Sequence, residues 1–259
     1  MADGHRGRPL YGRPLHGRTA LVTGGAGGIG RAVCAALAAA GARTVAADVD
    51  GAGAERTAAA LPGAAAVRID LADPEDVAAG VDRVRAAAPG GVDVLVHNAG
   101  VSVIGPFCDS DPADWDLMWR VNARAPMQLT QAFLPGMTER GFGRLIFVSS
   151  DGARAGSGGE GAYAATKAAL FGLAKTLARE TARHGVTSNV LCPGPTDTPM
   201  LRGVAREHPG LVDRLARRIP VGRLGDPRDV AEAAAFLAGP GASYITGQTL
   251  SLSGGMTMH

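Results

Sequence analysis

Aromatic residues are scarce in this chain of 259 residues, where they make up 4% of the sequence. The hydrophobic fraction of 46% must therefore come mainly from alanine, valine and leucine, which predicts a globular domain with an aliphatic core. No apolar run approaches the roughly 20 residues that a membrane helix needs. The N-terminus also lacks the apolar segment of a signal peptide, so we expect a cytoplasmic protein with no membrane partner.

The chain also has few cysteines and a small net charge. The three cysteines, Cys34, Cys108 and Cys192, are odd in number and far apart, which fits neither a disulfide framework nor the spacing of a metal site. We therefore expect no metal ion and a reducing compartment. The formal net charge of +2 provides no field that would attract nucleic acid or an anionic membrane, so the expected partner is a small molecule.

Residues 1–16 differ from the rest of the chain, because a Gly-Arg-Pro-Leu unit occurs in them twice, at 7–10 and 12–15. Proline, glycine and arginine without apolar periodicity predict a flexible basic tail. An arm that binds phosphate is the alternative. No second change of composition follows, so residues 17–259 are predicted to form one domain.

Beyond the tail, short apolar runs alternate with longer segments rich in alanine and leucine. Such runs are typical of buried strands, and the longer segments have a helical composition. The alternation predicts an α/β fold, a Rossmann-like doubly wound parallel sheet of about seven strands with helices on both faces. Strands are expected at 19–23, 44–48, 65–69, 92–96, 144–149, 186–191 and 248–252; helices are expected up to 40, near 52–61, after 75, over 112–138 with an interruption around Pro126, over 160–184 and from 226.

The regular alternation lapses at about 195–225, where prolines and arginines surround short helical stretches. We predict that this segment is a lid over a substrate. Its arginines could attract an anionic group or form a solvated helix face, and both interpretations stay open. They are Arg202, Arg206, Arg214, Arg217 and Arg218.

A glycine-rich loop, Gly25-x-Gly27-x-x-Gly30, lies between the first predicted strand and helix. Glycines let the backbone approach a pyrophosphate, which then lies at the N-terminus of the helix. Asp48 ends the second predicted strand, where a carboxylate accepts hydrogen bonds from the adenosine ribose and repels a 2′-phosphate. This pattern predicts NAD as the cofactor, with NADP the weaker candidate. A carboxylate at the start of the next helix is the alternative role for Asp48.

Tyr163 and Lys167 stand four residues apart in a predicted helix, so their side chains project from the same face. An ammonium beside a phenol favours the phenolate, and we expect Lys167 to lower the pKa of Tyr163 towards the range of a general base. Ser150 ends a predicted strand thirteen residues earlier and offers a hydroxyl to the same substrate oxygen. Taken alone, the Tyr-x-x-x-Lys spacing could also be an accident of a helix surface.

With these motifs in place, the chain resembles the short-chain dehydrogenase/reductase family from Leu15 to Gly255. The cofactor loop of the family is matched by Thr23, Gly24, Gly28 and Gly30, and its Asn-Ala-Gly motif by residues 98–100. The resemblance implies four catalytic residues, Ser150, Tyr163, Lys167 and Asn122. It implies cofactor binding by Thr23, Gly24, Gly28, Ile29, Gly30, Asp48, Asp70, Leu71, Asn98, Ala99, Gly100, Tyr163, Lys167, Pro193, Gly194 and Thr198.

The resemblance also implies a role for each catalytic group. Tyr163 would be the acid/base, Lys167 would hold the nicotinamide ribose, Ser150 would polarise the substrate oxygen, and Asn122 would hold a water beside Lys167. Two residues depart from the pattern of the family: His97 stands where an asparagine is usual, and Ser253 where an aspartate is usual.

The sequence therefore predicts an NAD-dependent oxidoreductase that interconverts a secondary alcohol and a ketone, on a cyclic or hydroxyacyl-type substrate. An NADPH-dependent 3-oxoacyl or polyketide-type ketoreductase is the alternative, and a cofactor-binding regulator without turnover is a third. A homotetramer is implied by the resemblance. Asp151, unusual after the catalytic serine, is expected either to meet a polar substrate group or to face water.

Overall fold

The computed structural model describes residues 13–258, apart from the side chain of Glu207. Most of the predicted tail lies outside the described residues, but its last part does not. Leu15 is fully buried in the core, and its N–H donates to the carbonyl oxygen of Ala40 over 2.9 Å. The prediction of a flexible segment up to residue 16 is therefore wrong for Leu15, whose apolar side chain packs under the first helix.

Seven parallel strands form one sheet in the order β3-β2-β1-β4-β5-β6-β7, which confirms the predicted doubly wound α/β fold. The order changes direction between β1 and β4, because β1 pairs with β2 on one side and with β4 on the other. Ligands of such sheets bind beyond the carboxyl ends of the strands at this reversal. The strands are β1 (Thr19–Thr23), β2 (Arg43–Asp48), β3 (Ala65–Arg68), β4 (Val94–His97), β5 (Gly143–Val148), β6 (Val186–Pro193) and β7 (Thr249–Leu252).

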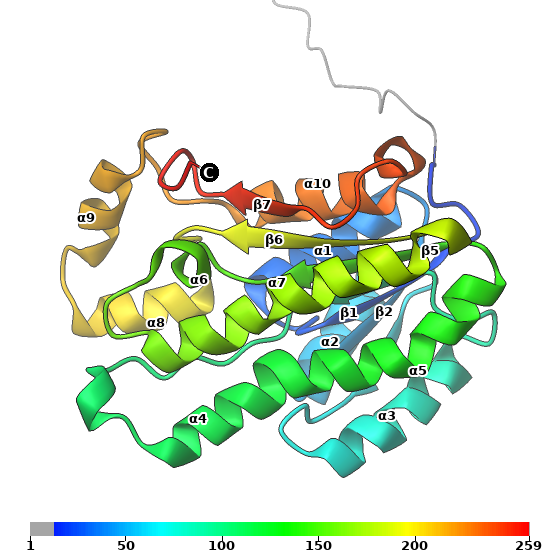
Figure 1. Ribbon diagram of the computed structural model, residues 1–259, viewed down its shortest axis with the longest axis horizontal. Coiled ribbons are helices and arrows are strands. Elements are labelled where there is room, and N and C mark those ends of the chain that lie inside the picture. Colours follow the sequence, from blue (N-terminus) through cyan, green and yellow to red (C-terminus); the bar gives the residue numbers. More distant parts are fainter. Residues whose placement is uncertain (1–12, 259) are drawn as a thin grey trace, which may run out of the picture.

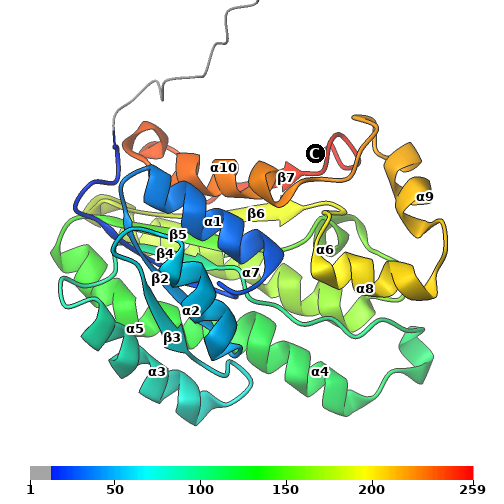
Figure 2. The same ribbon diagram turned by 180° about the vertical axis from the view of Figure 1, so that it is seen from behind.

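Helices cover both faces of the sheet (Figures 1 and 2). One face carries α1 (Gly28–Ala39), α2 (Gly51–Ala59) and α10 (Pro227–Ala238), and the other α3 (Pro74–Ala87), α5 (Ala125–Glu139) and α7 (Gly161–Thr181). The arrows of β6 and β7 point to the side of the molecule where the shorter helices lie (Figure 1). These are α4 (Pro112–Trp119), α6 (Gly152–Ala155), α8 (Pro199–Glu207) and α9 (Leu211–Arg218).

The core consists of two apolar layers, one on each face of the sheet. Successive residues of a strand point to opposite faces, and β4 shows this directly. Leu95 packs with the layer under α3, α5 and α7, whereas Val94 and Val96 pack with the layer under α1 and α10. This two-sided burial explains why the strands read as continuous apolar runs. Within residues 13–258 no helix is both long and apolar enough to cross a membrane.

The long helix predicted over 112–138 is interrupted earlier than the sequence suggested. A π-helical turn, η2 (Arg120–Arg124), joins α4 to α5, and Pro126 lies in the first turn of α5. Proline has no N–H to donate and its ring crowds the preceding turn, so the backbone widens on the N-terminal side. The predicted interruption is confirmed, but it is centred on Asn122 rather than on Pro126.

Candidate active site

The structure brings Tyr163 and Ser150 together at the carboxyl edge of the sheet. Tyr163 lies in the first turn of α7, and Ser150 follows β5. Burial and, to a smaller extent, the negative charge of Glu160 raise the pKa of Tyr163 to about 12, although the neighbouring Ser150 hydroxyl acts in the opposite direction. The phenol is therefore protonated at neutral pH and stands ready to donate a proton.

Lys167 is also at this site, but its ammonium does not act on the phenol as predicted. Nζ donates to the carbonyl oxygens of Val148, over 3.0 Å, and Ala99, over 3.4 Å. The side chain is buried, and this burial lowers the pKa of Lys167 to about 8. The predicted lowering of the Tyr163 pKa by Lys167 is wrong here, because burial and Glu160 raise that pKa and the Lys167 ammonium faces two carbonyl groups instead of the phenol.

Asn122 lies in the widened turn η2 and is fully buried. Its Oδ1 accepts the N–H of Val101 over 2.9 Å, and its Nδ2 donates to the carbonyl oxygen of Val101 over 2.9 Å and to Thr166 Oγ1 over 3.0 Å. The Thr166 hydroxyl in turn donates to the carbonyl oxygen of Tyr163 over 2.8 Å. Asn122 thus joins the loop after β4 to α7. Its predicted role in holding a water beside Lys167 stays a prediction.

The glycine loop is as tightly packed as the sequence pattern implied. Gly24 has a φ of +69°, and a β-carbon there would stand 2.8 Å from Asn98 Nδ2. A β-carbon on Gly30 would collide with the carbonyl oxygen of Gly24, and one on Gly28 would stand 3.2 Å from Pro199 Cδ. These glycines therefore keep the loop against β4 and against the start of α8.

The ends of β1 and β4 are joined by Thr23 and Asn98. Thr23 Oγ1 accepts the N–H groups of Asn98, over 3.1 Å, and Ala99, over 3.2 Å. Asn98 Nδ2 donates to the carbonyl oxygens of Thr23, over 3.0 Å, and Gly24, over 3.3 Å. Both predicted cofactor residues thus hold the backbone of the loop in place at the point where the strand order reverses.

Asp48 fixes the glycine loop from the other side. Its Oδ2 accepts the N–H of Ala26 over 2.9 Å, and its Oδ1 accepts the N–H of Asp50 over 3.0 Å. No arginine or lysine of the described chain forms an ion pair with this carboxylate. Asp50, and not Asp48, caps the start of α2, so the alternative role considered for Asp48 belongs to its neighbour.

The remaining predicted cofactor residues lie around the same edge. Asp70 Oδ1 accepts the N–H of Ala72 over 2.9 Å, and Leu71 packs at the margin of the core. Pro193 ends β6, and the N–H of Gly194 donates to Leu252 over 3.1 Å. Thr198 caps α8 and lies against Gly28. Ile29 is partly buried in the first turn of α1.

Asp151 is a residue whose setting the sequence did not reveal. It is 5% exposed, and its Oδ1 accepts a short hydrogen bond from Ser251 Oγ, which also accepts Arg154 Nη1 over 2.7 Å. Asp151 therefore does not face water as one prediction had it. The contact of Asp151 with Ser251 forms because β7 lies beside the end of β6. The sequence around Asp151 does not indicate this neighbour.

Three other residues were missed by the sequence analysis or left without a role. Ser149 Oγ donates to the carbonyl oxygen of Lys167 over 2.9 Å and so ties β5 to α7. His97 is buried and stacks on Phe147, with ring centroids 4.7 Å apart. Burial lowers the pKa of His97 to about 3, followed in effect by the charge of Lys167, so this imidazole is neutral. Ser253, the second departure, is buried and accepts the N–H of Thr257 over 3.1 Å.

These residues fit a nicotinamide dinucleotide. Five helices have a side-chain cap, from Asp50, Asp73, Asp111, Thr198 and Asp226, whereas α1 begins at Gly27 with none. The first N–H groups of α1 are therefore available to a phosphate. Among residues 13–258 no three His, Cys, Asp or Glu side chains are grouped in a way that could hold a metal ion.

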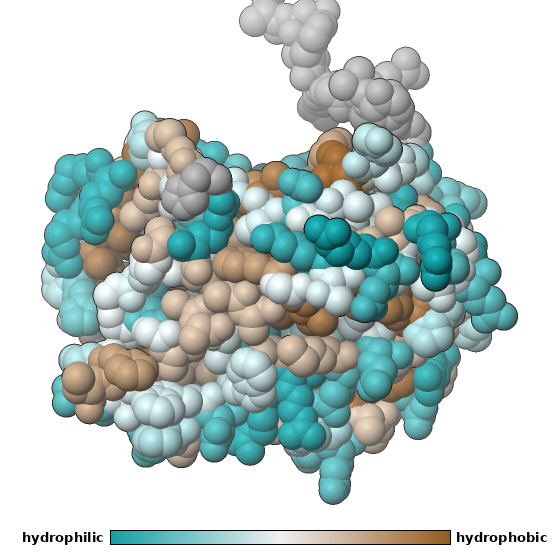
Figure 3. Space-filling view, in the orientation of Figure 1, coloured by the Kyte–Doolittle hydropathy of each residue, from teal (hydrophilic) through white to brown (hydrophobic). Residues whose placement is uncertain are grey.

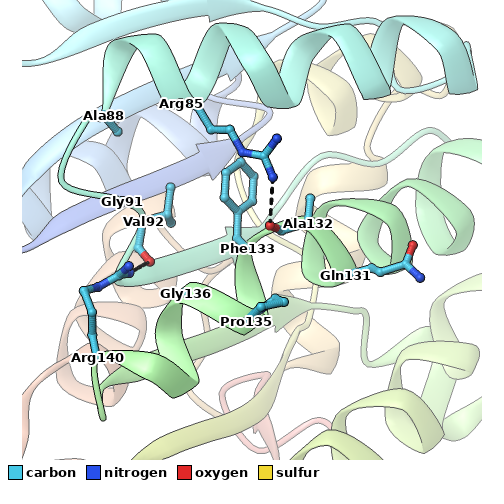
Figure 4. Close-up of a pocket in the computed structure, with 10 residues that line it drawn as sticks. All are labelled: Arg85, Ala88, Gly91, Val92, Gln131, Ala132, Phe133, Pro135, Gly136 and Arg140. Atoms are coloured by element: carbon cyan, nitrogen blue, oxygen red, sulfur yellow. Dashed lines mark hydrogen bonds between the residues drawn. The ribbon is translucent and has the colours of Figure 1, made fainter.

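A hollow of about 410 Å³ lies away from this site, between α3 and α5 (Figure 4). Its two arginines are already engaged: Arg85 Nη2 donates to Ala132 over 3.5 Å, and Arg140 Nη2 donates to Val92 over 2.7 Å. None of the predicted site residues lines it, so it plays no part in the proposed chemistry.

Comparison with known proteins agrees with this geometry. A family model described as enoyl-(acyl carrier protein) reductase matches residues 24–257. An acetoacetyl-CoA reductase of Rhizobium meliloti (strain 1021) is 39% identical, with 92% of this chain and 98% of the relative covered. The oxidoreductase UcpA of Escherichia coli (strain K12) is 40% identical over 94% of this chain and 96% of its own length. The chain belongs to the short-chain dehydrogenase/reductase family.

A solved member of this family has the same architecture. The crystal structure of a putative NAD(P)-dependent gluconate 5-dehydrogenase from Beutenbergia cavernae, with bound NADP at low occupancy, matches with a TM-score of 0.87 and 36% identity. The match covers 94% of this chain and 98% of the gluconate 5-dehydrogenase chain. The predicted family and fold are confirmed, and this short-chain dehydrogenase/reductase is an NAD(P)-dependent oxidoreductase.

Proposed function

We propose that this short-chain dehydrogenase/reductase interconverts a secondary alcohol and a ketone with NAD, on a cyclic or hydroxyacyl-type substrate. One observation carries the proposal: the side chains of Tyr163 and Ser150 lie together at the carboxyl edge of the sheet, close enough that the Ser150 hydroxyl favours the phenolate of Tyr163. Two hydroxyls at one point can hold a single substrate oxygen. Bound nicotinamide dinucleotide supplies the hydride acceptor or donor.

Tyr163 moves the proton at the substrate oxygen. In reduction the protonated phenol donates from Oη, and in oxidation it must first lose its proton to accept one from the alcohol. Ser150 donates a hydrogen bond to the same oxygen and polarises the C–O bond. With a pKa of about 8, Lys167 exchanges protons near neutral pH and is the group from which the site is reprotonated.

Asp48 supports NAD over NADP. A 2′-phosphate beside this carboxylate would meet a like charge, and two arginines of the adjoining elements are paired elsewhere: Arg56 with Asp50 over 3.4 Å and Arg68 with Asp76 over 3.8 Å. The predicted cofactor contacts of Asp70, Leu71, Pro193, Gly194 and Thr198 belong to the same proposal.

An NADPH-dependent 3-oxoacyl ketoreductase is the second candidate. It is favoured by the similarity to acetoacetyl-CoA reductase and by the NADP bound to the gluconate 5-dehydrogenase of Beutenbergia cavernae. The two candidates differ in the cofactor: NADP would place a negatively charged 2′-phosphate beside Asp48, and NAD would not.

Initial rates decide between them. The purified enzyme is assayed at the absorbance band of the reduced nicotinamide, with NAD and NADP, against cyclic alcohols and against acetoacetyl-CoA with the reduced cofactors. The proposal expects turnover of a cyclic alcohol with NAD, and a Tyr163→Phe variant that binds NAD while turnover falls by about 10²–10⁴-fold. Retained activity in Tyr163→Phe would refute the role of the phenol.

The proposed compartment, oligomeric state and lid of the enzyme are those predicted from the sequence. We infer a cytoplasmic homotetramer without nucleic-acid or membrane partners, in which the segment at 195–225, with α8 and α9, closes over the substrate. A groove of about 370 Å³ between α5 and α7 supports the contact between subunits, because Met127, Leu134, Leu173 and Leu177 line it. This groove lies on the face shown in Figure 3. A sedimentation coefficient that changes in a Leu173→Glu variant checks it.

A further inference from the structure

A carboxylate stands next to the catalytic hydroxyls and has no partner. Glu160 is the N-cap residue of α7 and stands three positions before Tyr163. The Glu160 side chain does not cap α7. It also forms no hydrogen bond or ion pair within the part of the chain that the structure describes.

The backbone directs this carboxylate towards the reacting centre. A β-carbon built on Gly152 would meet Ser150 Oγ at 3.4 Å and Glu160 Oε2 at 3.5 Å, so both oxygens border the same point. The negative charge of Glu160 acts on the Tyr163 hydroxyl as well, where it raises the pKa. Glu160 therefore faces both hydroxyls that would hold a substrate oxygen.

We propose that Glu160 is a specificity-determining residue that accepts a hydrogen bond from a hydroxyl on the carbon next to the reacting one. The inference rests on the proposed function and names its substrate class: vicinal diols and hydroxyketones, such as polyols or hydroxylated rings. A substrate with a carboxylate or phosphate at this position is disfavoured, because its negative charge would face that of Glu160.

The rim of the site is consistent with a substrate that also carries an apolar part. Ile104 and Phe107, on the segment that leads to η1 (Phe107–Asp109), are 53% and 61% exposed. β-carbons on Gly159 and Gly161 would stand 3.3 Å from Ile104 Cγ2 and 3.1 Å from Phe107 Cδ2, so this apolar segment packs against the residues that flank Glu160. Figure 3 shows a brown patch over this segment, at the lower left.

Matched alcohols test the proposal. The oxidation of cyclohexanol is compared with that of trans-1,2-cyclohexanediol, and of 2-butanol with 2,3-butanediol, using the full-length enzyme and NAD or NADP. The ratio of kcat/KM for the diol over the mono-alcohol is expected to fall about tenfold in Glu160→Ala, the loss of a hydrogen bond to a charged acceptor. It falls less in Glu160→Gln, since glutamine keeps an acceptor oxygen but not the charge.

Glu180→Gln is the control, because this exposed glutamate lies near the other end of α7 and its removal changes the net charge equally. An unchanged ratio in Glu160→Ala, with turnover retained, overturns the role of Glu160 and leaves the proposed function standing. Reduction of acetoacetyl-CoA with NADH, without oxidation of any of the four alcohols, overturns the role of Glu160 alone, since acetoacetyl-CoA has no hydroxyl on the carbon next to the ketone; the same reduction with NADPH only overturns the proposed function as well.

Discussion

Gly100 and Lys167 are packed so closely that a β-carbon on Gly100 would stand 2.8 Å from Lys167 Nζ. Gly100 ends the Asn-Ala-Gly motif after β4, and Lys167 reaches it from α7. The absence of a side chain at position 100 is thus what allows the ammonium to reach the carbonyl oxygens of Ala99 and Val148. The glycine matters for a contact rather than for its backbone conformation.

A Gly100→Ala variant should lose activity without losing the fold. The methyl group displaces Lys167 Nζ, and we expect kcat/KM to fall at least tenfold while the melting temperature stays within a few degrees. Gly105→Ala is the control, because a β-carbon there has no heavy atom within 4 Å. Equal activity in the two variants would show that the position of Lys167 is not critical.

Lys167→Met should change the pH dependence of stability. The pKa of Lys167 lies at about 8 in the folded protein, below its usual 10.5, so the unfolded chain binds more protons between these values. The stability of the wild type therefore gains from Lys167 as pH rises from 8 to 10.5, by at most about 3 kcal/mol. The variant lacks this gain. Urea unfolding at pH 7 and pH 10 should show the variant losing stability relative to the wild type; a constant difference would contradict the lowered pKa.

Asp48→Asn should relax the choice of cofactor. The amide removes the charge that repels a 2′-phosphate while keeping one oxygen for the N–H of Ala26, and we expect the NADP to NAD ratio of kcat/KM to rise about tenfold. Asp50→Asn controls for a general effect of charge, because Asp50 caps α2 nearby. The same shift in both variants would mean that Asp48 does not face the ribose.

Asn122→Ala should destabilise the protein by about 2–4 kcal/mol. The change removes the partners of the part-buried N–H and carbonyl of Val101 and also the bond to Thr166. Asn122→Asp keeps an acceptor for the Val101 N–H but places a buried carboxylate against the carbonyl oxygen of Val101, so it should be no more stable than Asn122→Ala. Guanidinium unfolding measures both. A loss of activity with unchanged stability would instead favour a purely water-holding role.

The elements of the fold were largely predictable because the five inner strands of the sheet are short, mostly apolar runs that are almost entirely buried. The π turn was not, since Arg120–Arg124 have ordinary helical composition and only the missing N–H of Pro126 hints at a break. In the site, the positions of Tyr163 and Lys167 follow from their spacing on one helix. Their pKa values do not, because desolvation depends on β5 and on the loop after β4, which lie far away in the sequence.

The turn at Arg120–Arg124 has a consequence for changes in chain length. A π turn holds one residue more than regular α-helical spacing, and each residue of an α-helix turns the chain by about 100°. Deleting any one of these five residues would straighten the hydrogen-bond ladder and swing α4 round relative to α5, carrying the Asn122 amide off Val101. A codon lost here would cost the enzyme its geometry even though the local helix became more regular.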